Sequence, residues 1–257
     1  MRILLTNDDG IESIFLRELA LALINQGHDL SVVAPRSEQS WVGASKSRNR
    51  GVHSDKADFG FGCPTWSVEG TPSDCVNIAI DHLLDNPPEG VVSGINIGLN
   101  TSLAFIIASG TVAGALEGAV HGLPAVAFSQ EIDDATYELF KTPQPKPDAK
   151  LTETLKISAG IAAAMAESLL ESIPRESFKV HNINFPMPCT PQTRVKRTVP
   201  AHMMVPGLFT PRDDAGKHKL IFARGNDISP KELITDKAAI AEGFISHSLL
   251  DYTKLGS

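Results

Sequence analysis

The sequence predicts an α/β fold in which a mostly parallel β-sheet is flanked by helices. Three features of residues 1–35 predict it. The short apolar run Arg2–Thr6 is typical of a strand that is buried on both faces. Apolar residues then recur at helical spacing over Ile11–Gln26, and Gly27 supplies a stop. A second β-branched run, Leu30–Ala34, completes a strand–helix–strand unit of the kind that builds parallel sheets.

The composition is that of an ordinary globular protein. The chain has 257 residues, 42% hydrophobic and 21% charged, enough for one large core or for a core with a smaller unit. The formal net charge of −7 does not indicate the basic surface that binds a nucleic acid duplex or an anionic membrane. No apolar stretch reaches membrane-spanning length, and Asp8 and Asp9 interrupt the first one too early for a secretory signal. We therefore expect a cytoplasmic protein that binds neither a membrane nor duplex nucleic acid.

Strands and helices continue to alternate up to residue 186. Residues 35–65 show little periodicity, so we expect a functional loop there, which could contain a small hairpin. Small residues on the helix that follows Ser109 should let it sit close to the sheet. The other predicted elements are strands at 66–68, 91–92, 125–128 and 179–184, helices at 71–84 and 148–170, and a proline-rich loop at 141–147.

From residue 187 onward the pattern changes. Helical periodicity is absent, and three stretches look like strands of hairpins, at 194–199, 203–205 and 217–224. A short helix at 236–242 and a strand at 244–249 follow. We interpret residues 1–186 as an α/β core and residues 187–257 as a β-rich extension.

Polar residues follow several of the predicted strands. Because the carboxyl ends of parallel strands meet at one edge of a sheet, the side chains that follow them gather where ligands bind. Two adjacent carboxylates in one turn repel each other unless a cation or a proton relieves them, and hard divalent cations prefer oxygen ligands. The residues that could form such a metal site are Asp8, Asp9, Ser40 and Asn96.

Each of these residues also has a purely structural interpretation. Asp9 and Glu12 fit a capping box at the start of the first helix. Ser40 in a polar loop can simply be solvated, and Asn96 beside glycines can form a turn. Taken singly, the structural interpretation is the better one for each residue. Their convergence on one sheet edge favours the metal site.

A second candidate feature is the helix N-terminus that follows Ser109. Free backbone N–H groups and a partial positive charge make such a terminus a site for anions, and Gly110 allows close approach. Ser109 could also be only a helix cap. The chain lacks the lysine of a P-loop and the GxSxG pattern of serine hydrolases, so neither of those chemistries is expected.

These residues belong to longer blocks that resemble the SurE (survival protein E) family of nucleotidases. The resemblance implies a Rossmann-like core over residues 1–186. It also implies that residues 187–257 complete this core, exchange a hairpin between subunits and mediate formation of a homodimer or homotetramer. The blocks are Ile3–Ile11, Val33–Pro35, Glu38–Ser40, Gly70–Val76, Val92–Asn100, Ser109–Val112, Glu117–Gly118, Gly122–Ala125 and Asn182–Pro186, with weaker matches at Thr235–Asp236 and Glu242–Ser246.

The resemblance further implies a metal-dependent phosphatase that acts on nucleoside 5′- and 3′-monophosphates, with some activity on polyphosphate. We expect one divalent cation per subunit, Mg²⁺ or Mn²⁺. Its ligands would be Asp8, Asp9, Ser40 and Asn96. The catalytic residues would be Asp8, Asp9 and Asn96, and the phosphate would be held by Asn96, Asn100, Ser109, Gly110 and Thr111.

Three places depart from the family pattern. Ala108 stands where the family usually has an aromatic residue, Trp41 stands where it usually has glycine, and Ser246–Leu250 replaces a Ser-Val-Thr-Pro-Leu stretch. These departures bear on substrate preference and on the exchange of the hairpin. They leave open a second interpretation, in which the protein is a catalytically weak nucleotide-binding or regulatory protein of the same fold.

Receiver domains of signalling proteins also carry paired aspartates after their first strand. They need a further aspartate after the third strand and a lysine after the fifth. Here the corresponding positions hold Glu69 and Gly70, and Ser129 and Gln130. A receiver domain is therefore a poor alternative.

Overall fold

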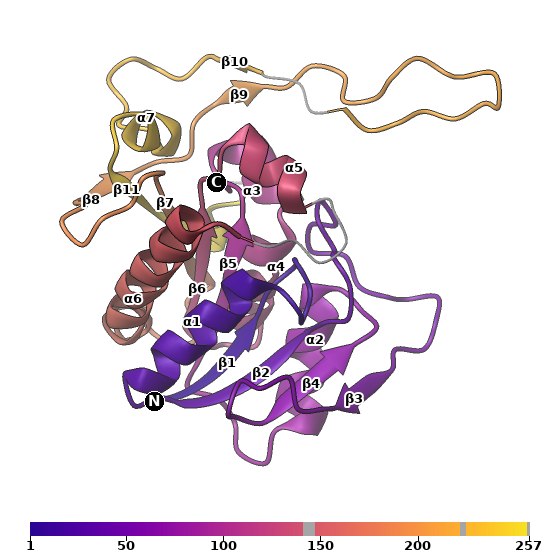
Figure 1. The fold of residues 1–257 in the computed structure, drawn as a ribbon, viewed down its shortest axis with the longest axis vertical. Coiled ribbons are helices and arrows are strands. Elements are labelled where there is room, and N and C mark those ends of the chain that lie inside the picture. The colour runs from indigo at the N-terminus through magenta and orange to yellow at the C-terminus, as the bar shows by residue number, and fades with distance from the viewer. Residues whose placement is uncertain (141–146, 222–224, 256–257) are drawn as a thin grey trace.

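The computed structural model describes residues 1–140, 147–221 and 225–255, and it confirms the α/β class (Figure 1). The described residues contain a nine-stranded mixed sheet in which the strands from β4 to β7 run parallel. Across the sheet the order is β3 (Ser54–Lys56), β4 (Thr65–Val68), β2 (Asp29–Pro35), β1 (Arg2–Thr6), β5 (Gly90–Ile97), β6 (Ala125–Gln130), β7 (Lys179–Phe185), β11 (Ile245–Asp251) and β8 (Val195–Thr198).

Helices cover both faces of this sheet, which is why its central strands are apolar throughout. On β1, Ile3 and Leu5 point into one core and Leu4 points into the other, as the alternation of a strand requires. The first core is covered by α1 (Ile14–Asn25) and α6 (Ala149–Glu171), which lie in front of the sheet in Figure 1. The second is covered by α2 (Pro72–Ile78), the π-helical turn η1 (Ala79–Leu83), α3 (Ser102–Ala108) and α4 (Gly110–Val120).

The chain beyond residue 187 adds strands to the same sheet. β11 pairs antiparallel with β7, and β8 pairs parallel with β11. Two short strands, β9 (Met203–Met204) and β10 (Asn226–Asp227), form a separate antiparallel pair, and α7 (Asp236–Ala241) precedes β11. Figure 1 shows the described part of the segment between β9 and β10 extending away from the sheet.

Several predicted elements are confirmed, and two predictions are corrected at their ends. The first helix begins at Ile14 with Ser13 at its N-cap, so the predicted capping box of Asp9 and Glu12 is wrong. The predicted strand at 91–92 is longer. As β5 it runs to Ile97 and contains Asn96, because it pairs with β6 again after a register shift between Ser93 and Asn96.

Other differences concern elements without a clear periodic pattern. The predicted hairpin at 194–199 is wrong, since β8 joins β11 in parallel. Helices α3 and α5 (Asp134–Phe140) were not predicted. The predicted loop 35–65 contains β3, which forms a hairpin with β4, the strand predicted at 66–68. Within the predicted strand 217–224, Leu220 forms a bridge with Phe209, whereas residues 222–224, and 141–146 of the proline-rich loop, lie outside the described residues.

No single helix in the described ranges is long and apolar enough to cross a membrane. The helices α3 and α4 have the length and apolar composition of a membrane span only when they are taken together, and they are bent by 70° relative to each other. Most residues of α4 are buried against the sheet and α2.

The small residues of α4 let the helix approach the sheet closely, as predicted. A Cβ atom added to Gly118 would lie 2.5 Å from Cγ2 of Val91 on β5. One added to Gly114 would lie 2.9 Å from Cγ2 of Thr6 on β1. This spacing holds the N-terminus of α4 against the carboxyl ends of β1 and β5.

We expect Gly118→Ala to lower the free energy of unfolding by about 1–2 kcal/mol, because overpacking against Val91 outweighs the ~1 kcal/mol that alanine gains in a helix. The matched control is Gly160→Ala in α6, where an added Cβ meets nothing within 4 Å. That variant should gain roughly 0.5–1 kcal/mol. Urea denaturation measures the free energy of unfolding of both variants. Equal changes in the two would contradict the close packing of α4.

Candidate active site

The residues after β1 form a tight turn that presents two adjacent carboxylates. Gly10 has φ +97°, a conformation that suits glycine, and the side-chain amide of Asn7 donates to the Gly10 carbonyl oxygen at 3.0 Å. The N–H of Ile11 donates to the carbonyl oxygen of Pro35, at the end of β2, at 2.8 Å. Asp8 and Asp9 are therefore held at the carboxyl edge of the sheet, where the sequence placed them.

Asp8 is 3% exposed and lies against the first turn of α4. The Thr111 hydroxyl donates to Oδ1 of Asp8, and a Cβ added to Gly110 would lie 2.8 Å from Oδ2 of the same carboxylate. Ser109 is the N-cap of this helix, and its Oγ accepts the N–H of Val112 at 3.0 Å. The structural role predicted for Ser109 is thus confirmed, and it places the first turn of the helix beside Asp8.

Asp9 is held by the last residue of β5, which directly follows Asn96. The N–H of Ile97 donates to Oδ2 of Asp9 at 2.9 Å, which is the contact that replaces the predicted helix cap. The amide nitrogen of Asn96 donates to the Gly98 carbonyl oxygen at 2.7 Å. Within the described chain the amide oxygen of Asn96 accepts no hydrogen bond, so this oxygen is the atom that can serve as a ligand.

Desolvation raises the pKa of both carboxyl groups. Desolvation raises the pKa of Asp8 from 3.8 to about 6, although the hydrogen bonds from Thr111 oppose the shift. Desolvation raises the pKa of Asp9 well above its ordinary value, and the neighbouring charge of Asp8 raises it further. The carboxylate of Glu38 adds to both shifts, and no lysine or arginine of the described chain lowers either pKa. The turn therefore concentrates negative charge that no basic side chain offsets.

Ser40 is held near the aspartate turn by a backbone hydrogen bond of the preceding residue, Gln39. The N–H of Gln39 donates to the carbonyl oxygen of Asp8 at 2.7 Å, which joins this loop to the turn after β1. The Ser40 hydroxyl is exposed and donates to Oε1 of Glu38 at 2.7 Å. Glu38 is thus a third carboxylate near the site that was not predicted, and its only signal in the sequence was its place two residues before Ser40.

Asn100 lies in a buried polar network rather than in the turn with the aspartates. Its side-chain amide donates to Oγ of Ser129 at 2.9 Å, and its N–H donates to Oδ1 of Asn184 at 2.8 Å. Its carbonyl oxygen accepts the side-chain amide of Asn182 at 2.9 Å. These contacts join the segment after β5 to β6 and β7, which gives Asn100 a positioning role at this edge.

The predicted donor set fits a divalent cation by its chemistry. It combines two carboxylates, an amide oxygen and a hydroxyl, which are the ligands that Mg²⁺ and Mn²⁺ prefer. The described residues contain no group of three or more His, Cys, Asp or Glu side chains arranged around one point, so the two aspartates would carry the charge of the site. Their raised pKa values indicate that a cation would stabilise the turn.

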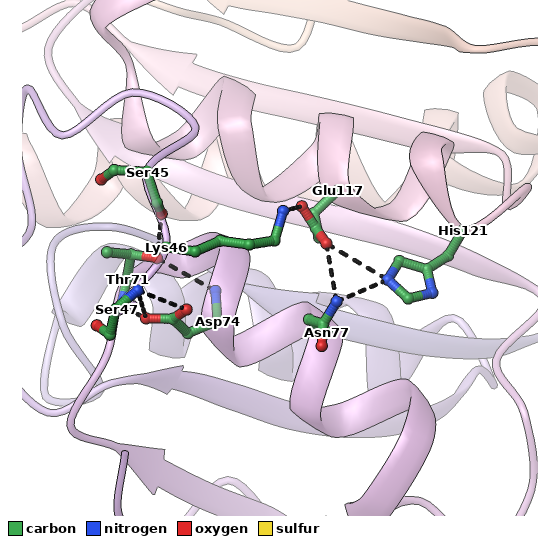
Figure 2. Close-up of polar contacts among 8 residues, drawn as sticks. All are labelled: Ser45, Lys46, Ser47, Thr71, Asp74, Asn77, Glu117 and His121. Carbon is green, nitrogen blue, oxygen red and sulfur yellow. Dashed lines mark hydrogen bonds and ion pairs between the residues drawn. The ribbon is translucent and has the colours of Figure 1, made fainter. Parts of the chain in front are cut away.

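The loop after Ser40 is anchored to α2 and α4 at residues 45–47 (Figure 2). Lys46 pairs with Glu117 of α4 at 2.6 Å, and Glu117 is only 4% exposed. Asn77 and His121 contact the other carboxylate oxygen of Glu117, at 3.1 and 3.3 Å. A buried carboxylate with these partners fixes the middle of the loop to α2 and α4.

The start of α2 holds the same loop at a second place. Thr71 and Asp74 form a capping box, and Thr71 also donates to the carbonyl oxygen of Ser45 at 2.7 Å. Asp74 accepts the N–H of Ser47 at 3.1 Å (Figure 2). Thr71 is the N-cap of α2, and the cap also serves to attach the loop.

Comparison with known proteins shows the family and supports the fold. The family model described as Survival protein SurE matches residues 3–205. The chain belongs to the SurE family. The crystal structure of the SurE protein from Aquifex aeolicus superposes with a TM-score of 0.72 and 27% identity, over 98% of this chain and 93% of that one.

Two relatives in the SurE family carry the name 5′-nucleotidase SurE. The protein from Trichormus variabilis is 43% identical over 131 residues, which are 50% of this chain and 49% of that protein. The protein from Prochlorococcus marinus is 42% identical over 98 residues, 37% of each chain. The chain thus spans half or less of the length of these relatives. The match to the Aquifex structure extends the likeness in fold over nearly the whole chain.

We expect Asp8→Asn to stabilise the protein at neutral pH in the presence of a chelator. Because the folded pKa of Asp8 is about 6 and its ordinary value is 3.8, the folded state favours the protonated form. The wild type should therefore lose stability as the pH rises from about 4 to above 6, by at most about 3 kcal/mol. Asparagine removes this loss, so the variant should gain about 1–3 kcal/mol at pH above 7 and little near pH 4.

Urea denaturation of both proteins at several pH values measures this difference. Asp85→Asn, an exposed substitution in the loop before β5, is the matched control and should show no pH-dependent gain. A gain for Asp8→Asn that is the same at low and neutral pH would contradict the burial of a strained charge.

Proposed function

We propose that the protein is a metal-dependent phosphatase that hydrolyses nucleoside 5′-monophosphates to nucleoside and phosphate. The observation that carries the proposal is the adjacent pair Asp8–Asp9, in which Asp8 is buried against the N-terminus of α4 and Asp9 is half-buried beside it. The name 5′-nucleotidase of two relatives supports the substrate class. We extend the proposal to nucleoside 3′-monophosphates and to polyphosphate, and to a cytoplasmic location, as predicted from the sequence.

The metal site would be formed by Asp8, Asp9, Ser40 and Asn96, with one Mg²⁺ or Mn²⁺ per subunit. When bound, such a cation offsets the charge of a phosphate and lowers the pKa of a bound water. Thr111 orients the Asp8 carboxylate, and the Ile97 N–H orients that of Asp9. One of the two aspartates would also accept a proton from the attacking water.

The phosphate would lie between the aspartate turn and the first turn of α4. A helix N-terminus stabilises negative charge, and the missing side chain at Gly110 lets the Asp8 carboxylate lie against this turn. The Ser109 N–H already donates to the Ile106 carbonyl oxygen, and Thr111 donates to Asp8. Of the predicted phosphate contacts, the Gly110 N–H, the Ser109 hydroxyl and the side chain of Asn96 are therefore the proposed donors. Because they stand fixed before the reaction, they would stabilise the charge that develops in the transition state. Asn100 would act indirectly, by holding the segment after β5.

We further propose that residues 187–257 join subunits, through exchange of the segment between β9 and β10. The described part of this segment extends from the body and exposes Phe209 (63%) and Leu220 (52%), and Met204 (61%) of β9 is exposed beside its start. Such a group of exposed apolar side chains is typical of a surface that another chain covers. A homodimer or homotetramer would cover it.

Analytical ultracentrifugation tests this assembly. We expect the wild type to sediment as a dimer or tetramer, and Phe209→Asp with Leu220→Asp to shift the population toward the monomer, because a charge at the covered surface opposes association. Val120→Ser, which changes an exposed apolar side chain at the end of α4, is the control. A monomeric wild type would refute the exchange.

We expect Asp8→Asn and Asp9→Asn each to lower metal-dependent turnover of AMP by about 100-fold or more, because each removes a charged ligand of the cation. Phosphate release from a panel of nucleoside monophosphates with Mn²⁺, with and without chelator, measures it. Near-normal turnover by either variant would overturn the site assignment.

Calorimetric titration with Mn²⁺ provides a readout that is independent of turnover. Both variants should bind Mn²⁺ more weakly than the wild type, while Asp85→Asn should bind it equally well. If the wild type binds Mn²⁺ and AMP but releases no phosphate, the protein is the catalytically weak nucleotide-binding protein that the sequence left open.

A further inference from the structure

A tryptophan with an exposed ring stands beside the proposed metal ligands. Trp41 follows Ser40 directly and is 41% exposed. Its ring meets that of Phe105 on α3 edge to face, with 5.5 Å between the centroids and 86° between the planes. Phe105 in turn precedes Ser109 by one helical turn. The two aromatic rings therefore lie at the side of the site where the loop after Ser40 meets the end of α3.

The backbone of Trp41 is in a conformation that a bulky residue rarely adopts. Its φ is +64°, in the left-handed region where glycine is the usual residue. Strain of this kind persists where the surroundings enforce it, and it is concentrated at functional sites. The SurE family usually has glycine at this position, so the chain places a large aromatic ring where the backbone favours no side chain.

The loop is held firmly on both sides of the ring. Before it, the N–H of Gln39 donates to the Asp8 carbonyl oxygen at 2.7 Å. After it, the N–H of Gly43 donates to the Ala108 carbonyl oxygen at 2.9 Å, and Lys46 reaches the buried Glu117 at 2.6 Å (Figure 2). The loop that carries the indole is thus attached to the turn after β1, to Ala108 at the end of α3, directly before the N-cap of α4, and to Glu117 on α4.

We propose that Trp41, supported by Phe105, is the surface on which the nucleobase of the substrate stacks. The inference rests on the proposed function and adds a subsite to it. Trp41 lies two residues after Gln39, so their Cα atoms are at most about 7 Å apart. A nucleotide whose phosphate lies at Asp8 and Gly110 would project its ribose and base outward, to the side where the exposed indole stands.

Stacking on an indole also predicts the kind of selectivity. Every base has a flat π-face, so an aromatic surface accepts purines and pyrimidines with little discrimination. The subsite should therefore distinguish a nucleotide from a phosphate ester without a base, rather than one base from another. It would supply the aromatic contact in a chain where Ala108 replaces the usual aromatic residue before Ser109.

The first experiment compares kcat/KM for AMP with kcat/KM for ribose 5-phosphate, which lacks the base. Trp41→Gly removes the ring and suits the left-handed backbone, so it should fold. We expect the ratio of the two constants to fall at least about fivefold in Trp41→Gly, and Trp41→Phe to restore part of it. Trp66→Phe, which alters the other tryptophan, on β4, should leave the ratio as it is in the wild type.

The second experiment uses fluorescence and needs no turnover. The chain has two tryptophans, so Trp66→Phe leaves Trp41 as the single one. With Mn²⁺ present, AMP should quench the emission of this variant, whereas ribose 5-phosphate and inorganic phosphate should not. The same titration of Trp41→Gly, in which only Trp66 remains, should show no quenching.

Three outcomes would overturn the inference. One is an equal loss of activity on AMP and ribose 5-phosphate in Trp41→Gly. Another is emission of Trp41 that AMP does not alter. The third is an altered oligomeric state of Trp41→Gly with an unchanged ratio of the two constants, which would assign the exposed ring to a contact between copies of the chain. A wild type that hydrolyses neither substrate would instead refute the proposed function, and the quenching experiment would still test the base subsite.

Discussion

The buried contact between Asp8 and the first turn of α4 is the constraint on which the site depends. It requires that the helix come close enough for Thr111 to donate to the carboxylate, and that residue 110 have no side chain. Both requirements are met by small residues, since Gly110, Gly114 and Gly118 lie along the face of α4 that meets the aspartate turn and the sheet. A site that concentrates negative charge is thus built on a helix end that favours it.

The same contact explains why the loop around Ser40 is so firmly attached. The carbonyl oxygen of Asp8 holds Gln39, and the far side of α4 holds Lys46 through Glu117. Ser40 and Trp41 lie between these two attachments. The helix therefore organises both the polar part of the site at its N-terminus and, two turns further on, the loop that borders it.

Much of this could be predicted from the sequence, because strand and helix patterns in the first 186 residues are strong. The position of the two aspartates at the carboxyl edge of the sheet could be predicted from the order of the elements alone. The position of Asn96 did not, since β5 continues past a register shift that depends on pairing with β6. The role of Asn100 was also hidden, because its partners Ser129, Asn182 and Asn184 lie on other strands. Helix α3 was missed since Ser102–Ala108 is short, and its N-cap Thr101 makes no side-chain cap hydrogen bond.

The placement of β11 between β7 and β8 has a consequence for the order in which the protein assembles during synthesis. Ser246 of β11 pairs with Asn184 of β7, so the outer edge of β7 has no partner until the segment between them has left the ribosome. An open edge of a parallel sheet can pair with other chains. The nascent chain therefore passes through a stage in which the aspartate turn and α4 can already be in place while the sheet is still open on one side. Protection of that edge by chaperones would matter most at this stage.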